Sequence, residues 1–277
     1  MRIVSYRGER GERAGVLVEE GVADAWDALG GDGSTVRDLL ASGRLEALQG
    51  TAASDLPSTE VELLPPVPDP DKIVCIGLNY RAHAAEAGID PPERPTFFAK
   101  FRNALASPGA TVSLPDASGK VDFEAEVAFI VGRRCSGVSE SDAAECIAGY
   151  MLLNDLSARD LQFATPQWMP GKVFDGAAPC GPALVTPGEA LAAGPITFAL
   201  TLNGEVMQDA STDDLIFGPV QLVVELSRLM TLEPGDVVAT GTPSGVGSTR
   251  DPRVWLEPGD EIVISSPTLG QLETRLT

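Results

Sequence analysis

The chain has 277 residues, of which 43% are hydrophobic and 22% charged, and its 40 acidic and 20 basic side chains give a formal net charge of −20. This composition is typical of a soluble globular protein, and the negative charge disfavours nucleic acid and anionic membranes as partners. No apolar run approaches the roughly 20 residues of a transmembrane helix and no signal peptide is evident, so we expect a cytoplasmic protein.

The first 70 residues are predicted to form a small α/β domain. Two segments have strand character, and the apolar spacing over residues 36–48 predicts one helix, which Ser34 or Thr35 can cap and Gly50 can end. Four prolines within residues 65–70 prevent regular backbone pairing. This cluster predicts a domain boundary near residue 70.

Residues 71–277 are dominated by strand signals. Three helices are predicted, over residues 79–88, 139–149 and 220–230, and Asn203-Gly204 predicts a tight hairpin. Many strands with few helices indicate a β-rich α+β fold and not alternating βαβ units. The predicted strands cover residues 72–77, 96–101, 121–132, 149–155, 196–202, 236–242, 260–266 and 271–277.

The predicted strand over residues 121–132 carries Glu124 and Glu126 two positions apart. Side chains alternate between the faces of a strand, so both carboxylates point the same way and need a cation, a shared proton or water between them. Asp155 ends the next apolar run and offers a third carboxylate. An all-oxygen set suits Mg²⁺, Mn²⁺ or Ca²⁺ better than Zn²⁺. The alternative is that the two glutamates line a solvated strand face.

Two further positions are candidates for catalysis. His83 is the only histidine, and Glu86 follows three residues later on the predicted helix, where its carboxylate can orient the imidazole as a base. The alternative is an ordinary surface pair. Lys172 lies in a Gly- and Pro-rich loop, where a buried ammonium can stabilise an oxyanion or, with a lowered pKa, act as a base. A surface lysine is the alternative there.

In chain order, a set of segments over about residues 73–277 resembles the fumarylacetoacetate hydrolase family. The segments are IGLNYRAHAAE, FFAKFRNALASPG, DFEAEVAFIVG, NDLSARDLQ, GKVFDGAAPCGP, LNGEVMQD and TGTPSGVG. The chain looks most like bacterial acylpyruvate hydrolases and 2-hydroxyhepta-2,4-diene-1,7-dioate isomerases. The resemblance implies a mixed β-sandwich or roll, a small N-terminal domain and a homodimer.

The resemblance also implies roles for individual residues. Glu124, Glu126 and Asp155 would bind Mg²⁺ or Mn²⁺, with Ca²⁺ as a further candidate. His83 and Glu86 would activate water from a mobile segment, and Lys172 would be the active-site lysine. The residues implied to bind substrate are Tyr80, Lys100, Arg159, Gln162 and Thr242.

For function, the resemblance favours metal-dependent hydrolysis of a C–C bond in a small 2,4-dioxo acid. Acylpyruvate or fumarylpyruvate would give pyruvate and a carboxylic acid, as in the catabolism of aromatic compounds. The presence of His83 with Glu86 favours this reaction. One alternative is a lyase or isomerase: a decarboxylase of an oxaloacetate-like acid, or a decarboxylase or isomerase of a hydroxymuconate-type diacid. Another is a non-catalytic protein that binds a metal or an oxo acid.

Overall fold

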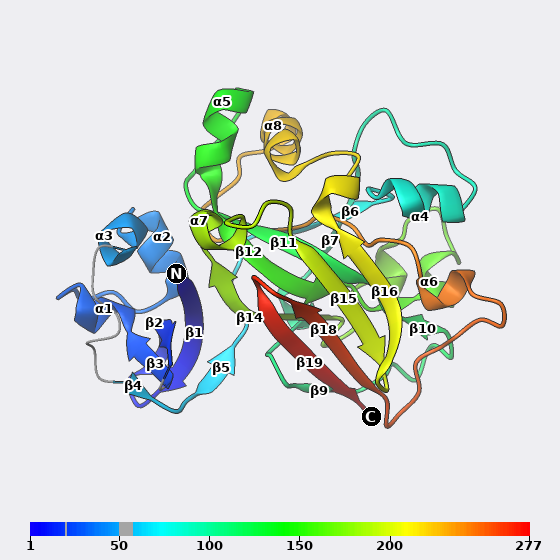
Figure 1. Ribbon diagram of the computed structural model, residues 1–277, viewed down its shortest axis with the longest axis horizontal. Helices are drawn as coiled ribbons and strands as arrows, with labels where there is room; N and C mark the ends of the chain where they lie inside the picture. The colour runs from blue at the N-terminus through cyan, green and yellow to red at the C-terminus, as the bar shows by residue number, and fades with distance from the viewer. Residues whose placement is uncertain (20, 50–57) are drawn as a thin grey trace.

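The computed structural model describes residues 1–19, 21–49 and 58–277 (Figure 1). The helices are α1 (Ala25–Ala28), α2 (Val36–Ala41), α3 (Leu45–Gln49), α4 (Arg81–Glu86), α5 (Glu140–Ala143), α6 (Arg159–Gln162), α7 (Pro187–Ala190) and α8 (Pro219–Leu229). The strands are β1 (Arg2–Gly8), β2 (Gly11–Val18), β3 (Gly21–Asp24), β4 (Ser58–Thr59), β5 (Glu62–Leu64), β6 (Ile73–Gly77), β7 (Thr96–Lys100), β8 (Leu105–Ala106), β9 (Thr111–Val112), β10 (Val121–Asp122), β11 (Ala125–Val131), β12 (Ile147–Asn154), β13 (Ser157–Ala158), β14 (Ala178–Val185), β15 (Thr197–Leu202), β16 (Glu205–Ser211), β17 (Val237–Ala239), β18 (Glu261–Ser266) and β19 (Gly270–Leu276).

Two main sheets form the frame of the molecule. Over the described residues the larger has twelve strands, in the order β4-β3-β2-β1-β14-β12-β11-β17-β6-β7, with β5 beside β1 and β8 beside β14. The smaller has the order β16-β15-β18-β19-β9, and β10 pairs with β13. Most neighbours are antiparallel, but β6 runs parallel to β17, β8 to β14 and β9 to β19. The predicted β-rich α+β fold with mixed sheets is therefore confirmed.

The two sheets differ in how their strands are buried. Every residue of β11 and β12 is buried, whereas β18 and β19 alternate between buried and more exposed positions. A strand buried on both faces reads as a continuous apolar run, and a half-buried strand alternates. The centre of the larger sheet thus lies deep in the protein, and polar groups carried there need partners inside the protein.

Some predicted elements are corrected by the structure. The single helix expected over residues 36–48 is split into α2 and α3, because Gly43 has φ +67, a left-handed conformation that ends a helix. Thr35 caps α2 through a capping box, as predicted, while Gly50 lies outside the described residues. Asn203-Gly204 does form the predicted hairpin between β15 and β16.

Two predictions near β12 and β14 are also wrong. The helix predicted over residues 139–149 stops early: α5 ends at Ala143, and Ile147 already begins β12. Strand β14 was missed because its proline and glycine residues indicate a loop. Among the described helices, none is long and apolar enough to cross a membrane.

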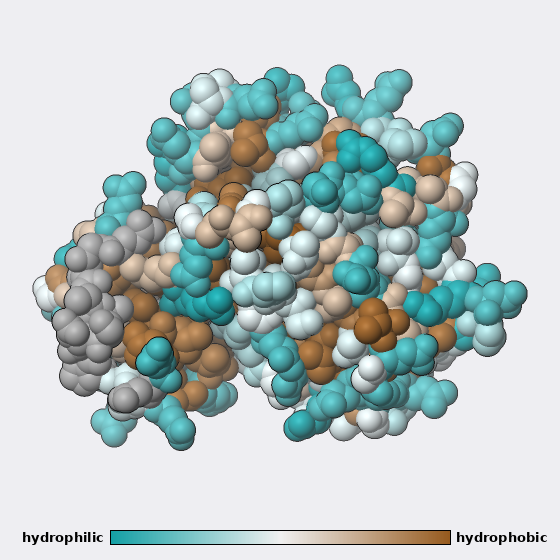
Figure 2. Space-filling view, viewed as in Figure 1, coloured by the Kyte–Doolittle hydropathy of each residue, from teal (hydrophilic) through white to brown (hydrophobic). Residues whose placement is uncertain are grey.

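The N-terminal strands continue the larger sheet. Strand β1 pairs with β14 through Arg2↔Val185 and Ile3↔Leu184, and Figure 1 shows β1–β5 at the end of the molecule beyond this junction. Apolar side chains gather over this region in Figure 2. Leu17 and Leu63 are partly buried and pack against a small second core cluster. The division near residue 70 stays a prediction, but the N-terminal unit is joined edge to edge to the rest.

Candidate active site

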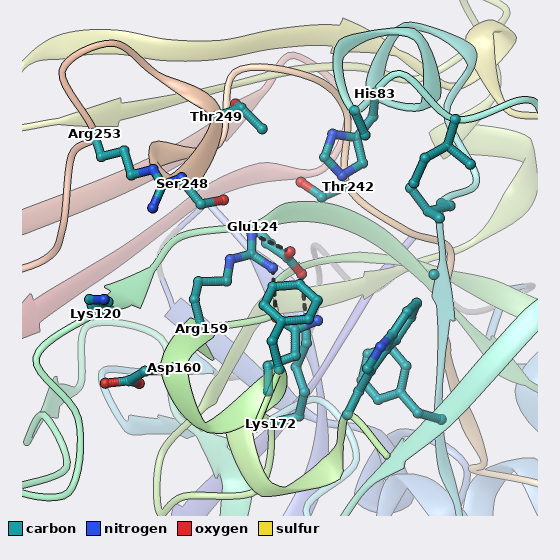
Figure 3. A pocket seen from close by; sticks show the side chains of 18 of the residues that line it. His83, Lys120, Glu124, Arg159, Asp160, Lys172, Thr242, Ser248, Thr249 and Arg253 are labelled. Atoms are coloured by element: carbon teal, nitrogen blue, oxygen red, sulfur yellow. Dashed lines mark hydrogen bonds and ion pairs between the residues drawn. The ribbon is translucent and has the colours of Figure 1, made fainter. Parts of the chain in front are cut away.

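One cavity of about 450 Å³ opens beside the start of β11 (Figure 3). Its wall is assembled from α4, β7, α6, the loop before β14 and the segment between β17 and β18. These elements are far apart in the sequence, so the fold and not a local motif creates the space. The predicted site residues that line it are His83, Glu124, Arg159, Gln162, Lys172 and Thr242.

The three predicted metal ligands converge at the base of this cavity. One carboxylate oxygen from each of Glu124, Glu126 and Asp155 lies within 4.8 Å of the others. The predicted strand over residues 121–132 is broken between β10 and β11, and Glu124 occupies the break. The amide of Asp155 donates to the carbonyl of Glu124 over 2.9 Å, which holds the two chain segments together. Both glutamates are buried, at 5% and 1% exposure, so the alternative of a solvated strand face is wrong.

Two cations neutralise part of this charge. Lys172 Nζ lies 2.6 Å from Glu124 Oε2 and 2.7 Å from Asp155 Oδ2, and Arg159 Nη2 lies 2.7 Å from Glu124 Oε1. Burial alone would raise the pKa of Glu124, but Arg159 and Lys172 lower it to about 2. Burial would likewise lower the pKa of Lys172, but the carboxylates of Asp155 and Glu124 raise it overall. Of the two roles considered for Lys172, this geometry favours the cation over the base.

The other carboxylate oxygens have fewer partners. Glu126 Oε2 accepts a hydrogen bond from the amide of Gly241 over 2.8 Å, and burial together with Asp155 and Glu124 raises its pKa well above the ordinary value. Asp155 Oδ1 accepts no hydrogen bond from the described residues, although Lys100 Nζ is 2.8 Å away. A buried carboxylate oxygen without a hydrogen-bond donor is costly, so this donor set fits a hard divalent cation.

Lys100 cannot satisfy Asp155 Oδ1 because its own hydrogens are already used. Its ammonium donates to the carbonyls of Leu156, Lys172 and Ala177 over 2.6 to 3.2 Å. Lys100 is 2% exposed and does not line the cavity, so its predicted contact with substrate is not found. Its position instead fixes the loop that carries Lys172.

Tyr80 is also placed differently from the prediction. Its side chain is fully buried and packs edge-on against Phe198, with ring centroids 6.3 Å apart. It does not line the cavity. Tyr80 is the N-cap of α4, so it anchors the helix on which His83 stands.

His83 and Glu86 form the expected pair on α4. His83 Nδ1 lies 3.0 Å from Glu86 Oε2, and Glu86 Oε1 accepts a hydrogen bond from the amide of Gly245 over 3.0 Å. The side chain of His83 is only 13% exposed, and Figure 3 shows its imidazole directed into the cavity. His83 therefore lies at the cavity wall, and Glu86 is held behind it by the amide of Gly245.

The remaining predicted residues contribute polar groups to the wall. Gln162 Oε1 accepts from Arg159 Nη1 over 2.9 Å. Thr242 Oγ1 donates to the carbonyl of Ala125 over 3.0 Å and accepts from Gln208 Nε2 over 2.9 Å. Thr242 is thus held by partners from β11 and β16, whereas Gln162 is held by a partner from its own helix, α6.

Several residues of this site were not predicted from the sequence. Asp122 is fully buried, and its carboxylate accepts from Arg159 Nε over 2.8 Å and from the amides of Gly247 and Ser248 over 2.7 and 3.0 Å. Its signal was present, because residues 122, 124 and 126 form one alternating series of acids. Gln208 had no such signal. Other missed residues of the wall are Lys120, Arg253 and Trp255.

Comparison with known proteins agrees with this geometry. Residues 72–277 match the family model described as fumarylacetoacetate (FAA) hydrolase C-terminal. The bovine mitochondrial oxaloacetate tautomerase FAHD2A is 41% identical over 78% of this chain and 69% of its own length. An HpcE-like protein from Mycobacterium smegmatis is 35% identical with a TM-score of 0.91, covering 100% of this chain and 99% of that one. Fumarylpyruvate hydrolase from Pseudomonas aeruginosa, solved with Mn²⁺ and pyruvate, is 31% identical with a TM-score of 0.68, covering 79% and 92%. The chain therefore belongs to the fumarylacetoacetate hydrolase family of enzymes.

Proposed function

We propose that the protein hydrolyses a C–C bond in a small 2,4-dioxo acid of the acylpyruvate type, releasing pyruvate and a carboxylic acid. The observation that carries this proposal is that His83, paired with Glu86, lines the same cavity as Glu124 of the buried carboxylate cluster. Hydrolysis needs a base for water and a site that stabilises the departing enolate, and the cavity offers residues for both. Membership of a family of enzymes disfavours the alternative of a non-catalytic binding protein.

Glu124, Glu126 and Asp155 would hold the metal, for which we propose Mg²⁺ or Mn²⁺. Their oxygen donors suit either ion, and Asp155 Oδ1 lacks any other donor among the described residues. When bound there, a divalent cation would supply Lewis acidity toward the oxygens of a 2-oxo carboxylate.

His83 would act as the base. Glu86 accepts from Nδ1–H, which fixes the tautomer and leaves Nε2 free to take a proton from water. The hydroxide equivalent adds to the distal carbonyl carbon, the bond between that carbon and the pyruvate unit breaks, and its electron pair passes to the pyruvate enolate. The protonated imidazole can then return its proton to the enolate carbon. The charge of Lys172 stabilises the enolate, because its ammonium stays protonated beside Asp155.

A second candidate reaction is keto–enol tautomerisation of oxaloacetate. It is favoured by the relatives named oxaloacetate tautomerase, one of which is 41% identical to this chain. This reaction moves a proton between carbon and oxygen of the substrate, so it requires a proton acceptor but no attacking water. The same His83 can serve, and the two reactions are distinguished by their products.

The experiment is a comparison of wild type and His83→Ala on acetylpyruvate with MgCl₂, with release of pyruvate and acetate as the readout. General acid–base catalysis typically contributes about 10²- to 10⁴-fold, so kcat should fall by that amount. Glu86→Gln keeps the size of its side chain and should cause a smaller loss. Pyruvate release that is unchanged in His83→Ala, or equal in EDTA, would refute the proposal. If acetylpyruvate releases no pyruvate but enol-oxaloacetate is rapidly converted to its keto form, the tautomerase reaction is supported instead.

A further inference from the structure

Part of the cavity lining is apolar, and much of that part lies close to His83 in the chain. Residues 77–89 carry His83 and also supply three apolar positions of the lining. Two large hydrophobic residues of the lining, Ile89 and Phe163, are 48% and 66% exposed. Apolar surface that is open to solvent inside a cavity is typical of a ligand site. We call the following six residues the apolar wall: Leu78, Ala87, Ile89, Phe98, Phe163 and Trp168.

The aromatic part of the apolar wall is built by close packing. Trp168 meets Phe98 edge-on, with ring centroids 5.9 Å apart, and Phe98 is only 7% exposed. A Cβ atom added to Gly77 would lie 2.4 Å from the Trp168 ring, so the indole occupies space that a glycine leaves open. The ammonium of Lys172 lies 4.9 Å from the centroid of the Phe98 ring. The apolar wall therefore begins directly beside the charged base of the cavity.

Leu78 is held in an unfavourable backbone conformation. Its φ is +53, in the left-handed region that glycine and asparagine adopt readily and leucine does not. The next residue, Asn79, is fully buried and donates to the carbonyls of Phe217 and Thr240 over 3.0 and 2.8 Å, which fixes the chain at this point. Within the described residues, Leu78 neither belongs to an apolar core cluster nor packs against one, yet it lines the cavity. Backbone strain that core packing does not explain is typical of a functional site.

We propose that the apolar wall binds the acyl group of the substrate, and that this group is apolar and larger than methyl. The inference rests on the proposed function for the position of the scissile carbonyl, which must lie within reach of His83 and so beside the segment that carries Leu78 and Ile89. An apolar acyl chain removes these side chains from water, and each buried methylene favours binding about fourfold. A carboxylate placed against the same surface would lose water without gaining a hydrogen bond.

Two basic residues, Lys120 and Arg253, also line the cavity, so the test must compare an apolar acyl group with an acidic one. Both residues are exposed, and Figure 3 shows them on the far side of Glu124 from His83. The matched substrates are succinylpyruvate, which ends in a carboxylate, and 7-methyl-2,4-dioxooctanoate, which has an isopropyl group in its place. With MgCl₂, wild type should prefer the isopropyl substrate to succinylpyruvate and to acetylpyruvate by about tenfold in kcat/KM. A preference for succinylpyruvate would overturn the inference.

Leu78→Asn separates specificity from folding. Asparagine tolerates the left-handed region, so the midpoint of thermal unfolding should stay unchanged or rise, while the preference for the isopropyl substrate should fall about tenfold through KM. Lower stability with an unchanged preference would show that Leu78 is purely structural and would contradict the proposal. Leu229→Asn is the matched control, because Leu229 is 69% exposed outside the cavity and its loss should leave the preference unchanged.

A binding test distinguishes failure of this inference from failure of the proposed reaction. Calorimetry with MgCl₂ would compare 7-methyl-2-oxooctanoate with 2-oxoheptanedioate, which repeat the two matched substrates without the 4-oxo group at which hydrolysis occurs. Tighter binding of 7-methyl-2-oxooctanoate that is lost in Leu78→Asn supports the apolar wall as a binding site, even if no dioxo acid is cleaved. Equal affinities, tighter binding of the diacid, or no binding of either acid would overturn it, even if acetylpyruvate is hydrolysed.

Discussion

The N-terminal unit and the active site each contain a buried group of charges, but the two groups are balanced differently. In the N-terminal unit one carboxylate, Asp24, accepts hydrogen bonds from Arg13, from the Tyr6 hydroxyl over 2.6 Å and from the amides of Trp26 and Asp27, both over 2.9 Å. Every oxygen has at least two donors. Such a group stabilises the fold and has no capacity left for a ligand.

The candidate active site has the opposite balance. Three cations, Arg159, Lys100 and Lys172, lie among four buried acids, which are Asp122, Glu124, Glu126 and Asp155. Asp155 Oδ1 accepts no hydrogen bond from the described residues. A surplus of donors therefore marks a structural ion pair, whereas a surplus of buried carboxylates marks a site for a cation.

The largest effect is expected for Lys172→Met in metal-free protein. The substitution leaves the buried carboxylates of Glu124 and Asp155 without their shared cation, and the loss of one partner of a buried pair typically costs about 3 to 5 kcal/mol. Urea unfolding in EDTA would measure the free energy of unfolding. Because the carboxylate surplus grows, MgCl₂ should stabilise this variant more than it stabilises the wild type.

The control for this experiment is Arg228→Gln. Arg228 forms an exposed pair with Glu225, at 62% and 29% side-chain exposure, and such pairs contribute about 0 to 1 kcal/mol. A loss in Lys172→Met no larger than in this control would show that the buried acids do not need the ammonium.

For Glu126→Gln we expect a smaller effect, which concerns the stabilisation by metal and not the stability of the metal-free protein. The amide removes one surplus charge while keeping the shape of the side chain, so metal-free protein should lose no stability. The gain from metal should disappear: at a free MgCl₂ concentration 100 times Kd, wild type gains about 2.7 kcal/mol and the variant close to nothing. Thermal unfolding across a MgCl₂ titration provides the measurement. A variant that is weakened in EDTA yet still stabilised by MgCl₂ would show that Glu126 is structural and not a ligand.

The buried carboxylates of the candidate site were easier to predict from the sequence than the cations that pair with them. Glu124, Glu126 and Asp155 could be found because strand alternation and strand ends are local patterns. Their partners come from elsewhere: Lys172 is 48 residues from Glu124 and lies in a loop with no local period. The resemblance predicted that Tyr80 and Lys100 bind substrate. In the structure both side chains are buried and neither lines the cavity.

The overall fold could be predicted for a similar reason. Half-buried strands such as β18 and β19 can be predicted from the alternation of apolar and polar residues, and the hairpin at Asn203-Gly204 from its turn residues. Strand β14 could not be found, because its glycine and prolines are tolerated only through tertiary packing. Lys120 and Arg253 belong to no motif and line one cavity only in the folded chain.

The smallest effect is expected in the N-terminal unit, from Asp24→Asn. The amide keeps one acceptor oxygen, so the variant loses only part of the hydrogen bonding to Arg13 and Tyr6; one hydrogen bond to a charged group contributes about 1.5 to 3 kcal/mol, and the net loss should lie in that range. Neither kcat nor the MgCl₂-dependent stabilisation should change, since Asp24 is not part of the cavity. Asp27→Asn is the control, because the Asp27 side chain is 56% exposed and its loss should cost less than about 1 kcal/mol.

The pH dependence of the stability difference between wild type and Asp24→Asn identifies the source of that difference. Burial would raise the pKa of Asp24, but the hydrogen bonds from Arg13 and Tyr6 lower it from 3.8 to about 2. A carboxyl whose pKa is lower in the folded than in the unfolded state stabilises the fold above the unfolded value, and this contribution is lost as pH falls through the folded value. The stability difference between wild type and Asp24→Asn should therefore be constant from neutral pH to about pH 4 and vanish near pH 2. A difference that persists at pH 2 would mean that shape, and not the ionised carboxylate, holds this group together. The contrast with the active site would then rest on the metal-dependent variants alone.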